Sequence, residues 1–288
     1  MTHSAFGALP CLAVLAFAAA FLAGCGDDDS FVPISRPDAN QDSELSSSSR
    51  YSSSCSSSSY SSSSSSARSS SSSQSRQNLN PLLKERGEQF NPDIDYGTMT
   101  DPRDGKTYRT VVVNGQTWMA ENLNYADNGI GLSLCYNDDE EMCELYGRLY
   151  SRDAAMNSSK CAGKAVCLLG NGPIQGLCPD GWHIPTYSEA QALVDLVDSN
   201  ASLLMSAKGW GIDGSISGTD EYGLSFVGTG GHNAEDNFNS YGLYTFMWVY
   251  RESSYMYYLL IRGVQNEAYI YNFDKYETRN PVRCIKNK

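Results

Sequence analysis

The chain has few of the residues and motifs on which most catalytic and nucleic-acid-binding proteins depend. Basic residues are scarce, because 21 Lys and Arg stand against 33 Asp and Glu, for a formal net charge of −12. A phosphate-rich partner requires clustered Lys and Arg, so this balance argues against nucleic-acid binding. Only 3 histidines are present, and no Gly-x-Ser-x-Gly elbow, P-loop or His-Glu-x-x-His helix occurs. We therefore expect a protein that is not an enzyme.

Close cysteine pairs are also missing. A structural zinc site usually needs Cys-x-x-Cys pairs, and none of the 9 cysteines has that spacing. Six of them lie between Cys135 and Cys284. An even number of cysteines in an exported chain is typical of disulfides formed outside the cytoplasm. We expect disulfides here and no metal.

The chain begins with an apolar segment, residues 5–22, and the sequence Leu-Ala-Gly-Cys occupies residues 22–25. Small residues before a cleavage site mark a secretory signal peptide, here residues 1–24. The ending resembles the bacterial lipobox, which implies that Cys25 carries lipid and becomes the mature N-terminus. The alternative is an uncleaved transmembrane anchor, since about 18 apolar residues approach the minimum for spanning a bilayer. The resemblance implies an outer-membrane lipoprotein, held by its lipid anchor and exposed at the cell surface.

Residues 25–90 are predicted to form a disordered, Ser-rich linker. Residues 46–75 are nearly all serine, and no hydrophobic period is sustained before about residue 90. Such a tract buries too little apolar surface to offset the entropy lost on ordering it. A flexible coil of this length reaches roughly 40–50 Å, enough to hold a domain clear of the lipid headgroups.

Residues 91–288 are predicted to form one α+β domain with antiparallel strands. The clearest element is a hairpin at residues 108–120, where two strand-like segments flank the tight turn Asn114-Gly115. Further strands are expected at residues 145–150, 182–184, 225–229, 245–251, 255–262, 268–273 and 282–285.

Two helices are expected in the middle of this domain. Ser151 is placed to cap a short one through Met156. A longer helix is expected to run to about residue 198, since Thr186 and Glu189 have the spacing of a capping box at its start. His183, just before it, is interpreted as a packed structural residue.

Five sequence blocks resemble, in order, the Fibrobacter succinogenes major paralogous domain. They are DGKTY (104–108), QTWMAENLN (116–124), YGRLY (146–150), CPDGWHIPT (178–186) and VRCI (282–285). The resemblance covers about residues 95–287, and members of that family are secreted or surface lipoproteins without an established enzymatic activity. The fourth block is also similar to the start of a helix in formylglycine-generating-enzyme-type domains, which implies a C-type-lectin-like fold.

The lectin-like resemblance implies a disulfide between Cys178 and Cys284, because such folds tie the start of the helix to the last strand. Six cysteines allow fifteen pairings. The two other pairs that we favour join neighbours in the sequence, Cys135 with Cys143 and Cys161 with Cys167. Formylglycine-generating enzymes use a reactive cysteine pair near the C-terminus. Here only Cys284 lies there.

Ligand-binding residues are expected in the loop at residues 228–244 and in nearby aromatics. Tyrosine joins a flat apolar face to a polar tip, which suits sugars and protein surfaces, although it is also a common strand residue. The family's paired tryptophans in a late strand are replaced here by Met247-Trp248. The candidate ligand-binding residues are His232, Asp236, Tyr241, Tyr244 and Trp248.

Calcium is the candidate cofactor. Lectin-like folds often carry it, and acidic runs occur at residues 138–141 and 235–237. Neither sugar-binding signature of C-type lectins accompanies these runs, and exposed acidic loops are common without a cation. We expect no cofactor, with calcium as the alternative.

Together these features predict a non-catalytic surface lipoprotein whose lectin-like domain binds an extracellular polysaccharide or protein in adhesion. The alternative is a structural cell-envelope protein without a small ligand. An enzyme on a formylglycine-generating-enzyme-like fold ranks third.

Overall fold

The computed structural model describes residues 81–126, 129–163, 166–233, 237–253, 255–273 and 278–288. The predicted signal peptide, Cys25 and most of the Ser-rich linker lie outside these residues. Within the described part of the chain, every helix is too short or too polar to cross a membrane.

The first of two five-stranded sheets gathers strands from both ends of the head. Its order is β1-β2-β3-β12-β6, and each neighbouring pair is antiparallel. The strands are β1 (Gly97–Thr100), β2 (Thr107–Val113), β3 (Gln116–Met119), β6 (Trp182–His183) and β12 (Ile285–Lys286).

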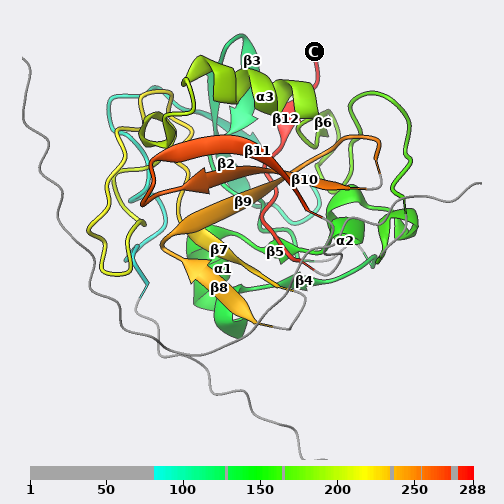
Figure 1. The fold of residues 1–288 in the computed structure, drawn as a ribbon, viewed down its shortest axis with the longest axis horizontal. Coiled ribbons are helices and arrows are strands. Elements are labelled where there is room, and N and C mark those ends of the chain that lie inside the picture. Colours follow the sequence, from blue (N-terminus) through cyan, green and yellow to red (C-terminus); the bar gives the residue numbers. More distant parts are fainter. Residues whose placement is uncertain (1–80, 127–128, 164–165, 234–236, 254, 274–277) are drawn as a thin grey trace, which may run out of the picture. The chain divides into compact units, whose positions relative to one another are not determined.

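The second sheet is built from the C-terminal third of the chain (Figure 1). Its order is β11-β10-β9-β7-β8, antiparallel except where β7 runs parallel to β9. The strands are β7 (Thr229–His232), β8 (Phe238–Tyr241), β9 (Tyr244–Val249), β10 (Met256–Arg262) and β11 (Glu267–Phe273). A separate short pair joins β4 (Ser133–Leu134) to β5 (Leu149–Tyr150).

The described residues contain three α-helices, one more than the sequence predicted. They are α1 (Glu140–Tyr146), α2 (Arg152–Met156) and α3 (Tyr187–Leu196). Short 3-10 turns occur at Tyr136–Asp138, Ser159–Cys161 and Ala201–Leu203. The mixture of helices and antiparallel sheets confirms the predicted α+β class.

The unpredicted helix α1 begins inside the acidic run that we interpreted as a loop or a calcium candidate. Asp139 precedes the helix and its side chain accepts a hydrogen bond from the amide of Glu141. Glu140 and Glu141 occupy the first turn, where negative charge is favourable because unpaired amides point outward. Because α1 ends at Tyr146, the strand predicted at residues 145–150 is reduced to β5.

The hairpin and the capping box are confirmed. Asn114 and Gly115 both have positive φ angles, 50° and 73°, as a tight turn between β2 and β3 requires. At the start of α3 the Thr186 hydroxyl accepts from the amide of Glu189, and the Glu189 carboxylate accepts from the amide of Thr186.

Helix α3 packs against strands of both sheets. Its buried face, which includes Leu193 and Val194, belongs to the same core as Trp118 of β3, Ile261 of β10 and Ile285 of β12. Figure 1 shows the helix beside β3 and above β11. The largest core is therefore shared by residues that are more than 160 positions apart, from Trp118 to Ile285.

The folded head also includes residues 81–90, which the sequence analysis assigned to the linker. Leu83 is fully buried and packs in a core with Tyr146 and Val227. Its amide donates to the Tyr146 hydroxyl at 2.8 Å, and the Leu82 amide donates to the Tyr241 hydroxyl at 2.8 Å. The head therefore includes described residues that precede the predicted boundary at residue 91, because two adjacent leucines, Leu82 and Leu83, are too short a run to give a periodic signal in the sequence.

Three disulfides close the head, in the pairing that the sequence analysis favoured. They join Cys135 to Cys143, Cys161 to Cys167 and Cys178 to Cys284. The last bond spans 106 residues and connects the segment before β6 to the residue before β12.

Candidate functional site

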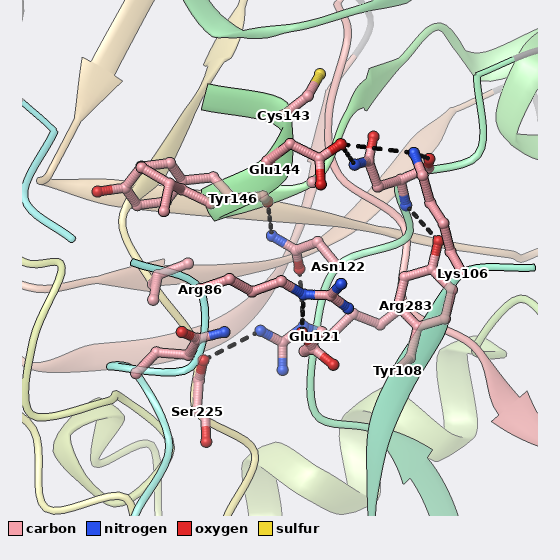
Figure 2. A pocket seen from close by; sticks show the side chains of 15 residues that line it. Arg86, Lys106, Tyr108, Glu121, Asn122, Cys143, Glu144, Tyr146, Ser225 and Arg283 are labelled. Carbon is pink, nitrogen blue, oxygen red and sulfur yellow. Dashed lines mark hydrogen bonds and ion pairs between the residues drawn. The ribbon is translucent and has the colours of Figure 1, made fainter. Parts of the chain in front are cut away.

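Arg283, from the closing VRCI block, lies at the centre of a buried polar cluster (Figure 2). Its Nε donates to the side-chain oxygen of Asn122 at 2.8 Å. Its two terminal nitrogens donate to the carbonyl groups of Leu224 and Ser225. The guanidinium also stacks on the Phe226 ring, 3.9 Å from the centroid. A buried charge with this many partners acts as a structural tie.

Asn122, from the second block, extends the cluster to the third block. Its amide nitrogen donates to the carbonyl of Tyr146 at 2.8 Å, and a side chain at Gly147 would collide with it, since an added Cβ would lie 2.6 Å from the Asn122 Cβ. The space left beside this cluster is about 20 Å³, which accommodates at most a single water molecule. We call Arg283, Asn122, Ser225 and Asp220 the Arg283 network. It has no room for a ligand.

The electrostatics of the Arg283 network fit this structural role. Burial lowers the pKa of Arg283 to about 9, opposed by the charges of Asp220 and Glu121, so the guanidinium stays charged at neutral pH. Burial raises the pKa of Asp220 to about 6, although hydrogen bonds from Ser225 and the charge of Arg283 oppose the shift.

A second network forms around His183 of the fourth block. One imidazole nitrogen lies 2.7 Å from the side-chain oxygen of Asn287, and the other lies 3.1 Å from both carboxylate oxygens of Glu189. Gln116 donates to the same carboxylate at 2.7 Å. We call His183, Glu189, Gln116 and Asn287 the His183 network. It ties α3 to β3, β6 and the C-terminal segment.

The pKa shifts show that the His183 network is an ion pair. Burial alone would lower the pKa of His183, but hydrogen bonds to Glu189 and Asn287 outweigh it and raise the pKa. Burial alone would raise the pKa of Glu189, but hydrogen bonds from His183 and Thr186 outweigh it and lower the pKa to about 2. Both neighbours accept hydrogen bonds, so His183 donates from both nitrogens. The interpretation of His183 as a packed structural residue is consistent with this geometry.

A different kind of cavity lies on the second sheet, with a volume of about 180 Å³. We call it the groove. Its wall is aromatic, made by Phe246 of β9, Tyr258 of β10 and Tyr271 of β11. Its polar lining consists mainly of the amide side chains of Asn233, Asn239 and Asn280. Gly231, His232 and Thr278 complete it.

The register of the sheet explains the aromatic wall. Tyr258 is the direct cross-strand partner of Trp248 on one side and of Tyr271 on the other. Paired residues share a face of the sheet, so the three rings form a row. The ring centroids of Trp248 and Tyr258 are 5.5 Å apart, and those of Tyr258 and Tyr271 are 6.2 Å apart. The row runs from the fully buried Trp248 to Tyr271, which is 40% exposed.

The polar side of the groove is held by backbone pairing. The amide and carbonyl of Asn280 bond to the carbonyl and amide of Tyr150, at 3.0 and 2.9 Å. His232 pairs in the same way with Arg279, whose guanidinium also donates to Nδ1 of His232. The His232 ring packs edge-on against Phe238 at 4.7 Å. These side chains are therefore positioned before any ligand arrives.

Of the five candidate ligand-binding residues, those that the structure describes lie in different parts of it, and only one of these lines the groove. His232 lines the groove. Trp248 was placed wrongly, because it is fully buried and its Nε1 donates to the Tyr150 carbonyl at 2.8 Å. Tyr241 packs against Tyr136 and Tyr146 and bonds through its hydroxyl.

The other two candidates add nothing to the groove. Tyr244 packs against Phe246 and the Arg262 guanidinium, outside the groove lining. Asp236 lies outside the described residues. Sequence reasoning missed Phe246 and Asn280, and it included Tyr258 and Tyr271 only among the aromatics near the loop, not among the five candidates. The strand pattern carried a signal for Tyr258 and Tyr271, because the cross-strand partners of Trp248 lie on the same face of the sheet.

One group of side chains in the described part of the chain has the spacing of metal ligands. The ligand atoms of Cys135, Glu140 and Cys143 lie within 4.8 Å of one another. The two sulfurs are joined in a disulfide, and metal binding requires thiolates. The arrangement therefore carries no metal proposal.

The comparisons with known proteins bear on the motif blocks. No curated protein and no solved structure matches the chain. Among protein families, the Fibrobacter succinogenes major domain matches residues 111–286. This range contains the Arg283 network, the groove and all of the His183 network except Asn287, and four of the five blocks lie in it. The chain belongs to the Fibrobacter succinogenes major domain family.

Proposed function

We propose that this chain is a non-catalytic binding protein of the cell envelope whose head takes up an extracellular carbohydrate or protein in adhesion. The groove is the observation that carries the proposal. It combines an aromatic wall with several convergent amides, the usual composition of a ligand site. The Arg283 network engages its polar groups inside the protein and has no room for a ligand, so it supports the head. The His183 network borders a separate open cavity of about 490 Å³, but its histidine and carboxylate are already paired with each other.

The anchoring part of the proposal rests on the sequence. The Leu-Ala-Gly-Cys ending supports lipidation of Cys25, and the serine tract supports a flexible spacer. Three disulfides in the head are consistent with an oxidising compartment. We therefore place the protein on the outer membrane, with its head at the cell surface.

We also propose that the head is C-type-lectin-like. The support is the long-range disulfide, which joins the segment before β6 and α3 to the C-terminal strand region, in a head whose two sheets share one core. The ligand is bound without a cofactor in this proposal. If so, a calcium chelator leaves the melting temperature of the chain unchanged, whereas a drop of several degrees would indicate a structural calcium ion.

The experiment is a glycan array combined with a pull-down on cell-wall material, using the full chain purified in detergent. We expect retention on one class of material, and its loss in the Tyr271→Ala variant. Tyr255→Ala is the matched control, because Tyr255 is similarly exposed and does not line the groove. Failure of the chain to bind any glycan, wall fraction or extracellular protein would refute the proposal.

One observation favours the structural envelope protein as the second candidate. Exposed apolar side chains, Val166 and Leu168, flank Cys167, which pairs with Ser253. Such a patch suits packing against a neighbouring envelope component. Crosslinking of the intact chain in its membrane through this patch, with no glycan binding, would select this candidate.

A further inference from the structure

We propose that the groove binds a single uncharged sugar ring, presented by a neutral polysaccharide, by stacking it on the Tyr258–Tyr271 wall. This inference rests on the proposed function and narrows its ligand from carbohydrate or protein to one chemical class. It follows from the size of the groove, its wall, its polar groups and its charge.

The size of the groove limits the ligand to a small unit. Its volume of about 180 Å³ equals roughly six water molecules at about 30 Å³ each. Pockets for drug-sized ligands begin near 300 Å³. One ring fits, whereas an extended peptide strand needs a longer channel.

The wall of the groove suits the C–H face of a sugar ring. Tyr258 and Tyr271 have nearly parallel rings, with an interplanar angle of 28°, and Phe246 stands across Tyr258 at 83°. The faces of aromatic rings are negative and their surroundings apolar, so they attract the slightly positive C–H groups on one side of a pyranose. Tyr258, Tyr271 and Phe246 therefore form a corner. A sugar ring can stack on the tyrosines, and Phe246 limits its movement along them.

The polar groups opposite the wall match hydroxyl groups. Asn233, Asn239 and Asn280 carry amide donors and carbonyl acceptors, and Thr278 carries a hydroxyl that does both. Each of the three amides also makes a hydrogen bond within the protein, which orients it: the Asn233 oxygen accepts from the Asn237 amide, Asn239 donates to the Asn237 carbonyl, and Asn280 donates to Thr278. A sugar hydroxyl also donates and accepts. Asn280 is almost fully buried and its backbone is paired with Tyr150 on both sides, so its side chain is presented with little loss of entropy.

The described lining of the groove disfavours ionic sugars. None of its described lining residues is Asp, Glu, Lys or Arg. Arg279 bonds to the lining residue His232 but does not itself line the groove, so a uronic acid would lose solvation without a lining Lys or Arg to replace it, and an amino sugar would lack a carboxylate. The net charge of −12 further disfavours polyanionic chains. Neutral sugars are what remains.

Gly231 keeps the floor of the groove open. A Cβ added there would lie 3.0 Å from the side-chain oxygen of Asn280 and 3.5 Å from the Phe246 ring, and both residues line the groove. Gly231 is absent from the glycines with positive φ, so its backbone accepts alanine. Gly231→Ala therefore narrows the site without straining its own backbone, and the Asn280 side chain shifts slightly to make room.

The test is a calorimetric titration of the full chain in detergent with short oligosaccharides. The neutral arm contains oligomers of glucose, xylose, mannose and galactose, and the charged arm contains oligomers of uronic acids and of glucosamine. We expect binding in the neutral arm alone. Affinity should fall at least tenfold in Tyr271→Ala and in Gly231→Ala, and change less than threefold in Tyr271→Phe, which keeps the ring, and in Tyr255→Ala.

The outcomes separate this inference from the broader proposal. Tyr271-dependent binding of charged oligomers, or of an extracellular protein, would keep the groove as a binding site and overturn the neutral-sugar assignment. If the affinity for neutral oligomers is the same in Tyr271→Ala and Gly231→Ala as in the unchanged chain, the groove is not the binding site. No binding in either arm would overturn the inference, and the glycan array and pull-down then decide the proposed function. Melting curves of all variants show that each is folded.

Discussion

The Arg283 network and the groove use their polar side chains in opposite ways. Beside the first sheet, Arg283 directs its charge inward, to Asn122 and to the carbonyl groups of Leu224 and Ser225. On the second sheet, the amides of the groove meet a cavity. The motif blocks supply the first set, whereas the groove residues, 231–280, fall between the last two blocks. The comparison teaches that the motif blocks supply residues that stabilise the head, whereas other residues form the groove. A chain can therefore keep the blocks while its ligand changes.

The largest expected effect comes from removing the long disulfide. Replacing Cys178 and Cys284 together by alanine should lower the free energy of unfolding by about 4–5 kcal/mol, since the bond closes a loop of 106 residues. Removing the Cys161–Cys167 bond, which spans 6 residues, should cost about 2 kcal/mol in the same entropic treatment. Urea unfolding followed by tryptophan fluorescence measures both, because all 4 tryptophans are buried. Equal losses would show that loop closure is not the cause.

The next effect tests whether Arg283 is a structural tie. Arg283→Met should destabilise the head by about 3–5 kcal/mol, because it leaves the buried carbonyls of Leu224 and Ser225 without their donor. Arg262→Met is the matched control, since Arg262 lies at the surface beside Glu267. Its replacement should change the free energy of unfolding by an amount that is hardly measurable. If the Arg283 variant matched the control, the contrast between the Arg283 network and the groove would fail.

A smaller effect concerns pH and the His183 network. The folded pKa of Glu189, about 2, lies below its usual 4.5, so its stabilisation is present above pH 4.5 and is lost as pH falls toward 2. The pKa of His183 is raised above its usual 6.5, so its stabilisation is complete below pH 6.5 and is lost as pH rises through the folded value. This pair therefore favours stability between pH 4.5 and 6.5.

The pair is partly open to solvent, so we expect a contribution of about 1–2 kcal/mol after screening. Urea midpoints measured from pH 3 to 9 should show a flatter profile in His183→Gln than in the unchanged chain. A parallel profile in the two proteins would mean that other groups determine the pH dependence.

The smallest effect on stability is expected in the groove. Tyr271→Ala should change the free energy of unfolding by no more than about 1 kcal/mol, because the ring is 40% exposed and loses chiefly its stacking on Tyr258. Thermal melting measures this change. A loss comparable to that of Arg283→Met would show that the wall belongs to the core and not to a ligand site.

Local signals in the sequence were sufficient for some elements and not for others. Asn114-Gly115 and the Thr186–Glu189 pair determine their own turn and cap, so the β2–β3 hairpin and the start of α3 were predicted. Helix α1 was missed because its capping residue, Asp139, stands in an acidic run that resembles a solvated loop.

The groove was harder to predict than the fold. Burial along β9 and β10 does not alternate regularly, so the strand pattern alone does not reveal which face meets a cavity. That choice depends on which strands are neighbours. The pairing of Tyr258 with both Trp248 and Tyr271 joins residues 23 positions apart, counting from Trp248 to Tyr271.

The bond between Cys178 and Cys284 has a consequence for a head that meets hydrolytic enzymes. It closes a covalent ring that contains every described residue lining the groove. A single proteolytic cut in any loop of that ring leaves the two fragments attached to each other. Such a nicked molecule migrates as one band on a non-reducing gel and separates into two only after a thiol is added, so damage to a loop does not by itself release the head.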